Sequence, residues 1–268
     1  MSTYVISDLH GCKEEFDAML DLIGFNDYDE MWINGDICDR GRESIPLLLE
    51  IMQYDNMHLI FGNHDVWLAR YCQELIDAKK DNNSVDMTDD MMNWLHYNGG
   101  YSTMDQFMDL SFPQCYDIKL FLEDKLLYKW LKVNGRKFLL VHAGTIADTP
   151  DANGHIDMKK VPEKILVWAH VGMDDNPLED GTILIVGHMP TFTYGDEYAG
   201  IIAHGKNDTI LHIDCGCVYG YTLGCIRLDD MKEFYVPSTY PKPFSSNYIT
   251  AGWPSSGSFL YAVRYMAV

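Results

Sequence analysis

The sequence has no long hydrophobic run, although 47% of its 268 residues are apolar. Its unbroken apolar stretches are a few residues long, whereas a transmembrane helix needs about 20 consecutive residues. Met1 is followed almost directly by a strand-like segment, without a basic region and an apolar core, so we expect no secretory signal peptide. We therefore expect a cytoplasmic protein without a membrane partner.

Basic residues are also scarce. The chain has 20 Lys and Arg against 40 Asp and Glu, which gives a formal net charge of −20. Nucleic-acid binding depends on Lys and Arg that neutralise phosphates, so we expect no nucleic-acid partner. A small phosphorylated ligand is compatible with this charge if bound divalent cations dominate the local field.

Paired cysteine motifs are absent. The seven cysteines are an odd number and include no Cys-x-x-Cys pair. Cys215 and Cys217 would point the same way if their segment is extended. Free thiols in a reducing compartment are the simplest interpretation.

What the sequence does contain is polar residues with glycine neighbours after short apolar runs. Five such segments occur: Ser7-Asp8-Leu9-His10-Gly11, Gly35 to Gly41, Gly62-Asn63-His64-Asp65, His142-Ala143-Gly144 and Gly187-His188-Met189-Pro190. The pattern predicts side chains delivered from the ends of neighbouring buried strands. Asp, Asn and His are ligands for hard or borderline divalent cations. The sequence therefore predicts a two-metal hydrolase.

The candidate ligands follow from the needs of phosphoester hydrolysis. Two cations about 3.5–4 Å apart lower the pKa of a bridging water and neutralise charge on the attacked group. We expect Asp8 and His10 on one ion, Asp36 shared, and on the second ion Asn63, His142 and His188. The set tolerates Mn, Fe, Zn or Mg, and Mn is our first expectation.

Three further residues are candidate catalytic groups. Arg40 can present a planar fork to two phosphoryl oxygens. His64 can protonate the leaving oxygen. Asp39 is expected to keep that imidazole protonated, because a nearby carboxylate favours the cationic form.

The order of expected elements indicates an α/β catalytic domain over residues 1–236. Near its start, amphipathic helices are expected over Lys13 to Ile23 and over Ser44 to Tyr54, the second with Ser44 as N-cap. Residues 66–128 are expected to form a helical cap inserted between strands. Residues 237–268 are expected to form an extension that packs on the same domain.

The ordered motifs resemble the metallophosphoesterases, in particular the phosphoprotein phosphatase branch with bacterial serine/threonine protein phosphatases and diadenosine tetraphosphatases. The branch's signature runs Gly-Asp-x-His-Gly, Gly-Asp-x-x-Asp-Arg-Gly, Gly-Asn-His-Glu/Asp, His-Ala/Gly-Gly and Gly-His-Thr-Pro, and the resemblance extends from Tyr4 to about Val236. It implies an αββα sandwich, in which two facing mixed β-sheets are flanked by helices, with a helical insert. It implies hydrolysis by a hydroxide that bridges two metals, without a covalent intermediate.

The resemblance also implies roles for individual residues. One metal would take Asp8, His10 and Asp36, and the second would take Asp36, Asn63, His142 and His188. The His64–Asp39 pair would be the acid dyad and Arg40 the phosphate clamp.

One departure from the family pattern concerns the substrate. His170 stands where bacterial members carry a second phosphate-binding Arg in a Trp-x-Arg segment. Histidine donates to a phosphoryl oxygen more weakly, so either Arg40 alone clamps the phosphate or the substrate preference has shifted. His170 thus joins Arg40 and Asn63 as a candidate substrate-binding residue. Met189 in place of Thr, and Ser7 in place of the first Gly, remove no ligand.

Three functions are compatible with these motifs. The first is a serine/threonine protein phosphatase with phosphorylated proteins as partners. The second is a hydrolase of bis-nucleoside tetraphosphates, which would use the same metals and a different cleft. The third is a non-catalytic scaffold, against which the presence of His64, Asp39 and Arg40 argues, since a binding module needs none of them.

Overall fold

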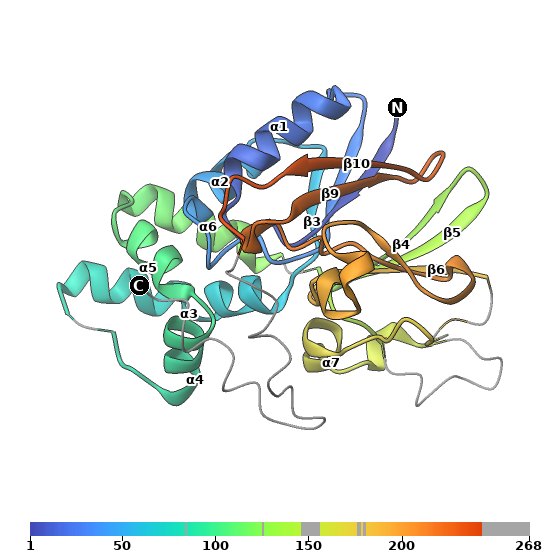
Figure 1. Ribbon diagram of the computed structural model, residues 1–268. Helices are drawn as coiled ribbons and strands as arrows, with labels where there is room; N and C mark the ends of the chain where they lie inside the picture. Colours follow the sequence, from blue (N-terminus) through green and yellow to red (C-terminus); the bar gives the residue numbers. More distant parts are fainter. Residues whose placement is uncertain (84, 125, 146–155, 176–177, 179–180, 243–268) are drawn as a thin grey trace.

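The computed structural model describes residues 1–83, 85–124, 126–145, 156–175, 178 and 181–242 (Figure 1). The expected extension at 237–268 falls inside the described residues only as far as Lys242. None of the described helices is both long and apolar enough to cross a bilayer.

Two five-stranded sheets form the centre of the molecule. Sheet A has the order β10 (Lys232–Pro237), β9 (Thr222–Arg227), β1 (Thr3–Ile6), β2 (Glu30–Ile33) and β3 (Met57–Leu59). Sheet B has the order β4 (Tyr128–Val133), β5 (Arg136–Val141), β6 (Ile183–Val186), β8 (Ile210–His212) and β7 (Ala203–His204). Both sheets are mixed, since β1, β2 and β3 run parallel, as do β5, β6 and β8, while β9 pairs antiparallel with β1 and β10, β4 with β5, and β7 with β8. The expected fold class is confirmed.

Alternation of side chains along the strands produces the layers. Val5 of sheet A and Leu140 of sheet B share the core between the two sheets. Their neighbours Ile6 and Val141 point to the opposite faces, which helices cover. These are α1 (Lys13–Ile23) over sheet A and α7 (Glu163–Trp168) beyond sheet B (Figure 1).

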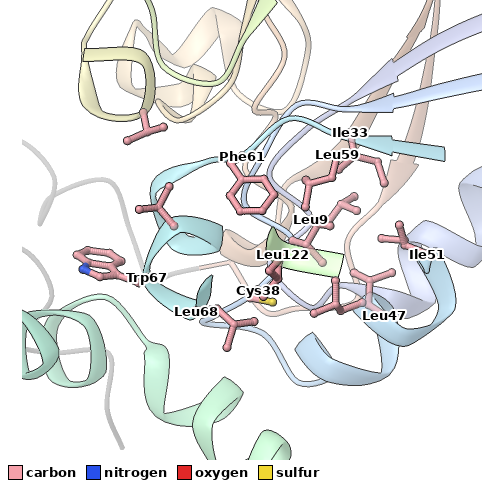
Figure 2. Packing of buried hydrophobic residues seen from close by; sticks show 14 of the residues in the cluster. Leu9, Ile33, Cys38, Leu47, Ile51, Leu59, Phe61, Trp67, Leu68 and Leu122 are labelled. Atoms are coloured by element: carbon pink, nitrogen blue, oxygen red, sulfur yellow. The ribbon is translucent and has the colours of Figure 1, made fainter. Parts of the chain in front are cut away.

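Apolar residues inside the polar motifs fix the site loops in this core. Leu9 and Cys38 are almost completely buried and pack in the same cluster as Leu47 of α2 (Ser44–Ile51) (Figure 2). Leu9 lies between Asp8 and His10 in the sequence, so its burial holds both polar neighbours at the end of β1. Burial of a leucine contributes about 1.5–3 kcal/mol, which is enough to hold a short loop in place.

Helices fill the sequence between β3 and β4 and form a group at one end of the sheets (Figure 1). They are α3 (Asn63–Asp81), α4 (Asp89–Met92), the π-helix Asn93–Tyr97, α5 (Gly100–Met108) and α6 (Phe112–Glu123). The start of α3 differs from the expectation, because the helix begins at Asn63 rather than at residue 66. Its first turn therefore carries two of the candidate site residues.

One local expectation is wrong, and the condition of another is not met. Ser44 is the first residue of α2 rather than its cap, and its Oγ accepts a hydrogen bond from the Asp39 amide at 2.9 Å. Cys215 and Cys217 do not share a face, because Cys217 begins a 3₁₀ turn, Cys217–Tyr219. The Cys215 side chain consequently packs between the sheets and that of Cys217 packs in the other core cluster.

Candidate active site

The candidate residues meet at the carboxyl ends of strands from both sheets. Asp8 follows β1, Asp36 follows β2, His142 follows β5 and His188 follows β6. Asn34 ties the two sheets together here, since its Nδ2 donates to the carbonyls of β5 residue Val141 at 3.1 Å and β6 residue Ile185 at 3.2 Å.

Asp36 lies at the centre of the group. Its Oδ2 is 3.3 Å from His142 Nε2, 3.6 Å from His10 Nε2 and 3.9 Å from His64 Nε2. Burial opposes the charge of Asp36, but the surrounding histidines outweigh burial and hold the pKa of its carboxyl well below the usual range. Burial likewise opposes the charge of His142, yet Asp36 and Asp8 raise the pKa of His142 to about 10. The centre therefore concentrates negative charge on Asp36.

Backbone carbonyls orient two of these imidazole rings. His10 Nδ1 donates to the Cys38 carbonyl at 2.8 Å, and His142 Nδ1 donates to the Asn34 carbonyl at 2.8 Å. Each Nε2 is thereby directed at the centre, as in histidines that bind metals. The Nε2 atoms of His142 and His188 are buried and have no hydrogen-bond partner among the described residues.

This arrangement fits divalent cations. Two groups have ligand atoms within 4.8 Å of one another, His10 with Asp36 and His64, and Asp36 with His142 and His188. His188 Nδ1 donates to Asn63 Oδ1 at 3.0 Å, which places the Asn63 amide beside the second group. The donors are carboxylate, amide and imidazole without thiolate, which suits hard or borderline ions.

Glycines leave room for the two aspartates. A Cβ at Gly62 would lie 2.0 Å from Asp36 Oδ1, and one at Gly187 would lie 2.1 Å from Asp8 Oδ2. The glycines of these motifs are thus required by close approach to a carboxylate.

Hydrogen bonds from two neighbouring residues hold the Asp8 carboxylate. Its carboxylate accepts the His188 amide at 3.1 Å on each oxygen and the Ser7 hydroxyl at 2.5 Å. The first of the two groups contains His64, and Asp8 belongs to neither group. Burial, together with the charge of Asp36, raises the pKa of Asp8 to about 7.

The Arg40 guanidinium lies between two histidines of the site. Its Nη1 donates to His10 Nε2 at 2.5 Å and its Nη2 donates to His64 Nε2 at 2.9 Å. The carbon of the guanidinium lies 5.8 Å from the centre of the Tyr219 ring. Arg40 thus directs a fork of donors at the centre of the site.

Asp39 and His64 form a buried pair. His64 Nδ1 donates to Asp39 Oδ2 at 2.6 Å. The same carboxylate accepts the Trp94 indole N–H at 2.7 Å and the Thr103 hydroxyl at 2.6 Å. Trp94 is therefore a buried packing residue that orients Asp39, whereas Tyr97 and Tyr101 are exposed.

The protonation of this pair differs from the expectation. Burial lowers the pKa of His64 to about 3, and the positive charges of Arg40 and His142 add to this effect. Burial raises the pKa of Asp39 to about 7. The carboxylate next to His64 favours a protonated imidazole, but the loss of solvent around both buried groups favours their neutral forms and has the larger effect.

His170 borders the centre at an exposed position. Its ring lies 5.7 Å from the ring of His188, and it lines a cavity of about 330 Å³ together with Met189 and Tyr194. Partial burial lowers the pKa of His170.

Strained backbone is concentrated at the site. Six candidate residues have φ in the left-handed region: Asp8 (53°), His10 (41°), Asp36 (57°), Asp39 (74°), Arg40 (67°) and His188 (67°). Each such residue costs on the order of 1 kcal/mol and persists only where the surroundings impose it. Such clustering is typical of functional sites.

Two residues that hold the loops and strands of the site in place were not predicted from the sequence. Asp65 accepts the amides of Asp36 at 2.7 Å, Ile37 at 3.0 Å and Gly62 at 2.9 Å, and so shapes two site loops. Its place at the end of the Gly-Asn-His-Asp segment was a signal that could have identified it. Asn34 carries no motif, and only the packing of the two sheets reveals its part.

Comparisons with known proteins agree with this geometry. The profile of the family described as calcineurin-like phosphoesterase matches residues 1–213. A protein of Chromobacterium violaceum named symmetrical bis(5'-nucleosyl)-tetraphosphatase is 26% identical, over 88% of this chain and 95% of the relative. One of the same name from Buchnera aphidicola subsp. Acyrthosiphon pisum is 40% identical over 107 residues, which cover 35% of this chain and 37% of the relative.

Solved structures show the same fold. A candidate diadenosine tetraphosphatase has a TM-score of 0.61 at 14% identity, covering 88% of this chain and 93% of its own. A protein serine/threonine phosphatase from Saccharomyces cerevisiae with similarity to human phosphatase PP5 has a TM-score of 0.55 at 17% identity, covering 91% and 82%.

Proposed function

Because the chain belongs to the calcineurin-like phosphoesterase family, we propose that this metal-dependent phosphoester hydrolase cleaves bis(5'-nucleosyl) tetraphosphates symmetrically. The observation that carries the proposal is that relatives matching almost the whole chain bear this activity in their names. The order of the sequence-based hypotheses is thereby reversed, since the serine/threonine protein phosphatase came first. Likeness to the yeast phosphatase, at 17% identity, concerns the fold alone.

The metal centre in this proposal uses the ligands expected from the sequence. Asp8, His10 and Asp36 would hold one cation, and the second would be held by Asp36, Asn63, His142 and His188. When bound, the two cations would lower the pKa of a water molecule and neutralise charge on the attacked phosphoryl group. Mn remains the first choice, with Fe, Zn and Mg compatible with the same donors.

Arg40, Asn63 and His170 would bind the substrate. The Arg40 guanidinium donates to His10 and His64 in the free protein, and would turn its donors to phosphoryl oxygens in the complex. His170 lines the adjacent cavity of about 330 Å³, where it would contact an outer phosphate or the nucleoside. A tetraphosphate offers oxygens to both residues, whereas a phosphoserine offers only one phosphate.

The reaction adds one water across the central phosphoanhydride bond. The water oxygen bonds to one inner phosphorus, the central bridging P–O bond breaks, and two nucleoside diphosphates leave. His64 Nε2 faces the centre, and Asp39 fixes its ring through the 2.6 Å hydrogen bond to Nδ1. His64, neutral in the free protein, would take up a proton of the attacking water at Nε2 and pass it to the departing phosphate oxygen.

The test is to compare substrates with the purified full chain and Mn²⁺. Diadenosine tetraphosphate should yield two ADP for each molecule consumed, as measured by anion-exchange chromatography. A phosphoserine peptide at the same concentration should release phosphate far more slowly. The Asp36→Asn variant, which lacks the shared carboxylate, is the negative control for both substrates.

Two results would overturn the proposal. Fast release of phosphate from the peptide without ADP formation would restore the protein phosphatase hypothesis. Turnover of neither substrate, with or without Mn²⁺, would support the scaffold.

A further inference from the structure

A further group of potential metal ligands lies outside the candidate active site. It consists of Cys12, next to the first residue of α1, Glu15 in the first turn of that helix, and Cys217 in the 3₁₀ turn before β9. Their ligand atoms all lie within 4.8 Å of one another. The three residues are only 1%, 2% and 2% exposed. Cys12 and Cys217 lie far apart in the sequence, and only the folding of the chain brings them together.

The Glu15 carboxylate is buried without a cation among the described residues. Its Oε1 accepts the Thr239 amide at 2.6 Å and the Thr239 hydroxyl at 2.8 Å. Neighbouring cations have other partners, since Lys13 pairs with Asp17 at 2.7 Å and Arg42 lies over the Tyr240 ring at 4.4 Å. The N-terminus of α1 offers only about half a positive charge. Buried carboxylates are ordinarily paired or bind metals.

Two thiols face this carboxylate. The Cys12 thiol donates a long hydrogen bond to the His10 carbonyl, with 3.9 Å between sulfur and oxygen, and the Cys217 sulfur lies within 4.8 Å of the Cys12 sulfur. Hydrogen bonds from Thr239 stabilise one oxygen of the carboxylate, but they do not account for the two sulfur atoms beside it. Two sulfurs and one carboxylate within coordination range form a donor set that selects thiophilic ions, unlike the nitrogen and oxygen donors around Asp36.

We propose that Cys12, Glu15 and Cys217 bind a thiophilic divalent cation, with Zn²⁺ as the best match. A water molecule would complete a tetrahedral site. Binding would release the two thiol protons to solvent and would leave two thiolates and one carboxylate around the ion.

The ion would connect three parts of the chain. It would fix the first turn of α1 to the turn Cys217–Tyr219, and, through the bonds from Thr239, to the segment after β10. Tyr219 at the end of that turn lies against Arg40. The site would therefore stabilise the fold and hold one wall of the active site, without touching substrate.

The experiment uses Co²⁺ as a spectroscopic probe. Thiolate ligands give Co²⁺ an intense charge-transfer absorption in the near ultraviolet, whereas the nitrogen and oxygen ligands proposed for the active site do not. The full chain with Co²⁺ should show this absorption, and added Zn²⁺ should abolish it. Cys12→Ser and Cys217→Ser should each lose it, while Cys72→Ser, a change at another buried thiol, should keep it.

A second variant separates metal binding from folding. Glu15→Gln keeps an acceptor for Thr239 but removes the charged ligand, so Co²⁺ affinity at this site should fall at least about tenfold. Elemental analysis should also find one zinc fewer per chain in Cys217→Ser than in the wild type. Absence of the absorption, its survival in Cys217→Ser, unchanged affinity in Glu15→Gln, or a Cys12–Cys217 disulfide by mass spectrometry would each overturn the proposal.

Discussion

At the scale of single residues, polar and apolar side chains alternate in the motifs for a physical reason. Leu9 and Cys38 are buried, while their neighbours Asp8, His10 and Asp39 turn to the site with left-handed backbone. The burial free energy of the apolar members offsets the strain of the polar members. Each of these site residues therefore stands next to the buried apolar residue that holds it in place.

The role proposed for His64 depends on the leaving group. A serine alkoxide is a poor leaving group and needs a proton, whereas a nucleoside diphosphate leaves with a phosphate oxygen of second pKa about 6. We expect His64→Asn to lower kcat about 10²–10⁴-fold on a phosphoserine peptide. On diadenosine tetraphosphate the loss should be about tenfold or less. Stopped assays with both substrates measure the ratio.

Elemental analysis is the control for this variant, because the metal content of His64→Asn should equal that of the wild type. Equal losses on both substrates would show that His64 acts by positioning rather than by proton transfer. Full activity on both would remove His64 from the mechanism.

A substitution at His170 tests whether the phosphates are bound by Arg40 without a contribution from His170. An arginine at this position would add a planar fork of donors beside His188. We expect His170→Arg to lower KM for diadenosine tetraphosphate about three- to tenfold, on the scale of one ordinary hydrogen bond. Initial-rate kinetics at fixed Mn²⁺ provide the measurement. An unchanged KM would place His170 outside the phosphate-binding set.

At the scale of elements, the helices between β3 and β4 contact the candidate Asp39–His64 pair and also belong to the core. The π-helix and α5 supply Trp94 and Thr103, both bonded to Asp39. Gly99, at the start of α5, accepts the Arg40 amide at 3.1 Å. A mutation in these helices should therefore act on the dyad from a distance.

Thr103→Val is the variant that tests this connection. The isosteric valine removes the hydroxyl that donates to Asp39 Oδ1 and accepts the Asp39 amide at 2.9 Å. We expect kcat to fall about tenfold and the free energy of unfolding to fall by about 1–3 kcal/mol. Ser102→Ala, which removes a hydroxyl bonded only to the Gly99 carbonyl, should change kcat little. If both variants keep the wild-type kcat, the helices do not position the dyad.

At the scale of the whole molecule, the two sheets are joined at their outer edges by a histidine. His204 of β7 contacts Glu233 of β10 at 2.7 Å through Nε2 and Asp208 at 2.9 Å through Nδ1. The hydrogen bond with Glu233, more than that with Asp208, raises the pKa of His204. A raised pKa in the folded state means that the contact stabilises fully below the unfolded pKa of about 6.5 and weakens as pH rises through the folded pKa.

We therefore expect the stability advantage of the wild type over His204→Gln to disappear at alkaline pH. Because His204 is partly exposed, the advantage should be about 1 kcal/mol or less. Urea unfolding at pH about 5.5 and about 9 measures the difference on either side of the titration. His96→Gln is the control, because the His96 ring bonds the neutral Tyr101 hydroxyl and its contact should not depend on a protonated imidazole. An advantage that persists at alkaline pH would contradict the protonated link.

The net charge of −20 acts over the whole molecule as well. Raising salt from about 0.02 M to about 0.2 M shortens the Debye length from about 20 Å to about 7 Å. We expect KM for diadenosine tetraphosphate to fall about two- to threefold over this range at fixed Mn²⁺, because screening weakens repulsion between two anions. A rise in KM would show that attraction by the metal centre and Arg40 outweighs the surface charge.

Local patterns in the sequence predict an α/β domain and the motif residues that assemble around Asp36, because glycine turns after short apolar runs put polar side chains at strand ends; the two facing sheets followed from the family resemblance. The sequence could not supply the residues that hold these motif residues: Asn34 acts between strands of two sheets, and Thr103 reaches Asp39 across 64 positions. The lowered pKa of His64 and the meeting of Cys12 with Cys217 were likewise decided only by the tertiary structure. Desolvation and contacts between distant segments arise only when the chain packs, whereas strand ends and turns are local properties of the sequence.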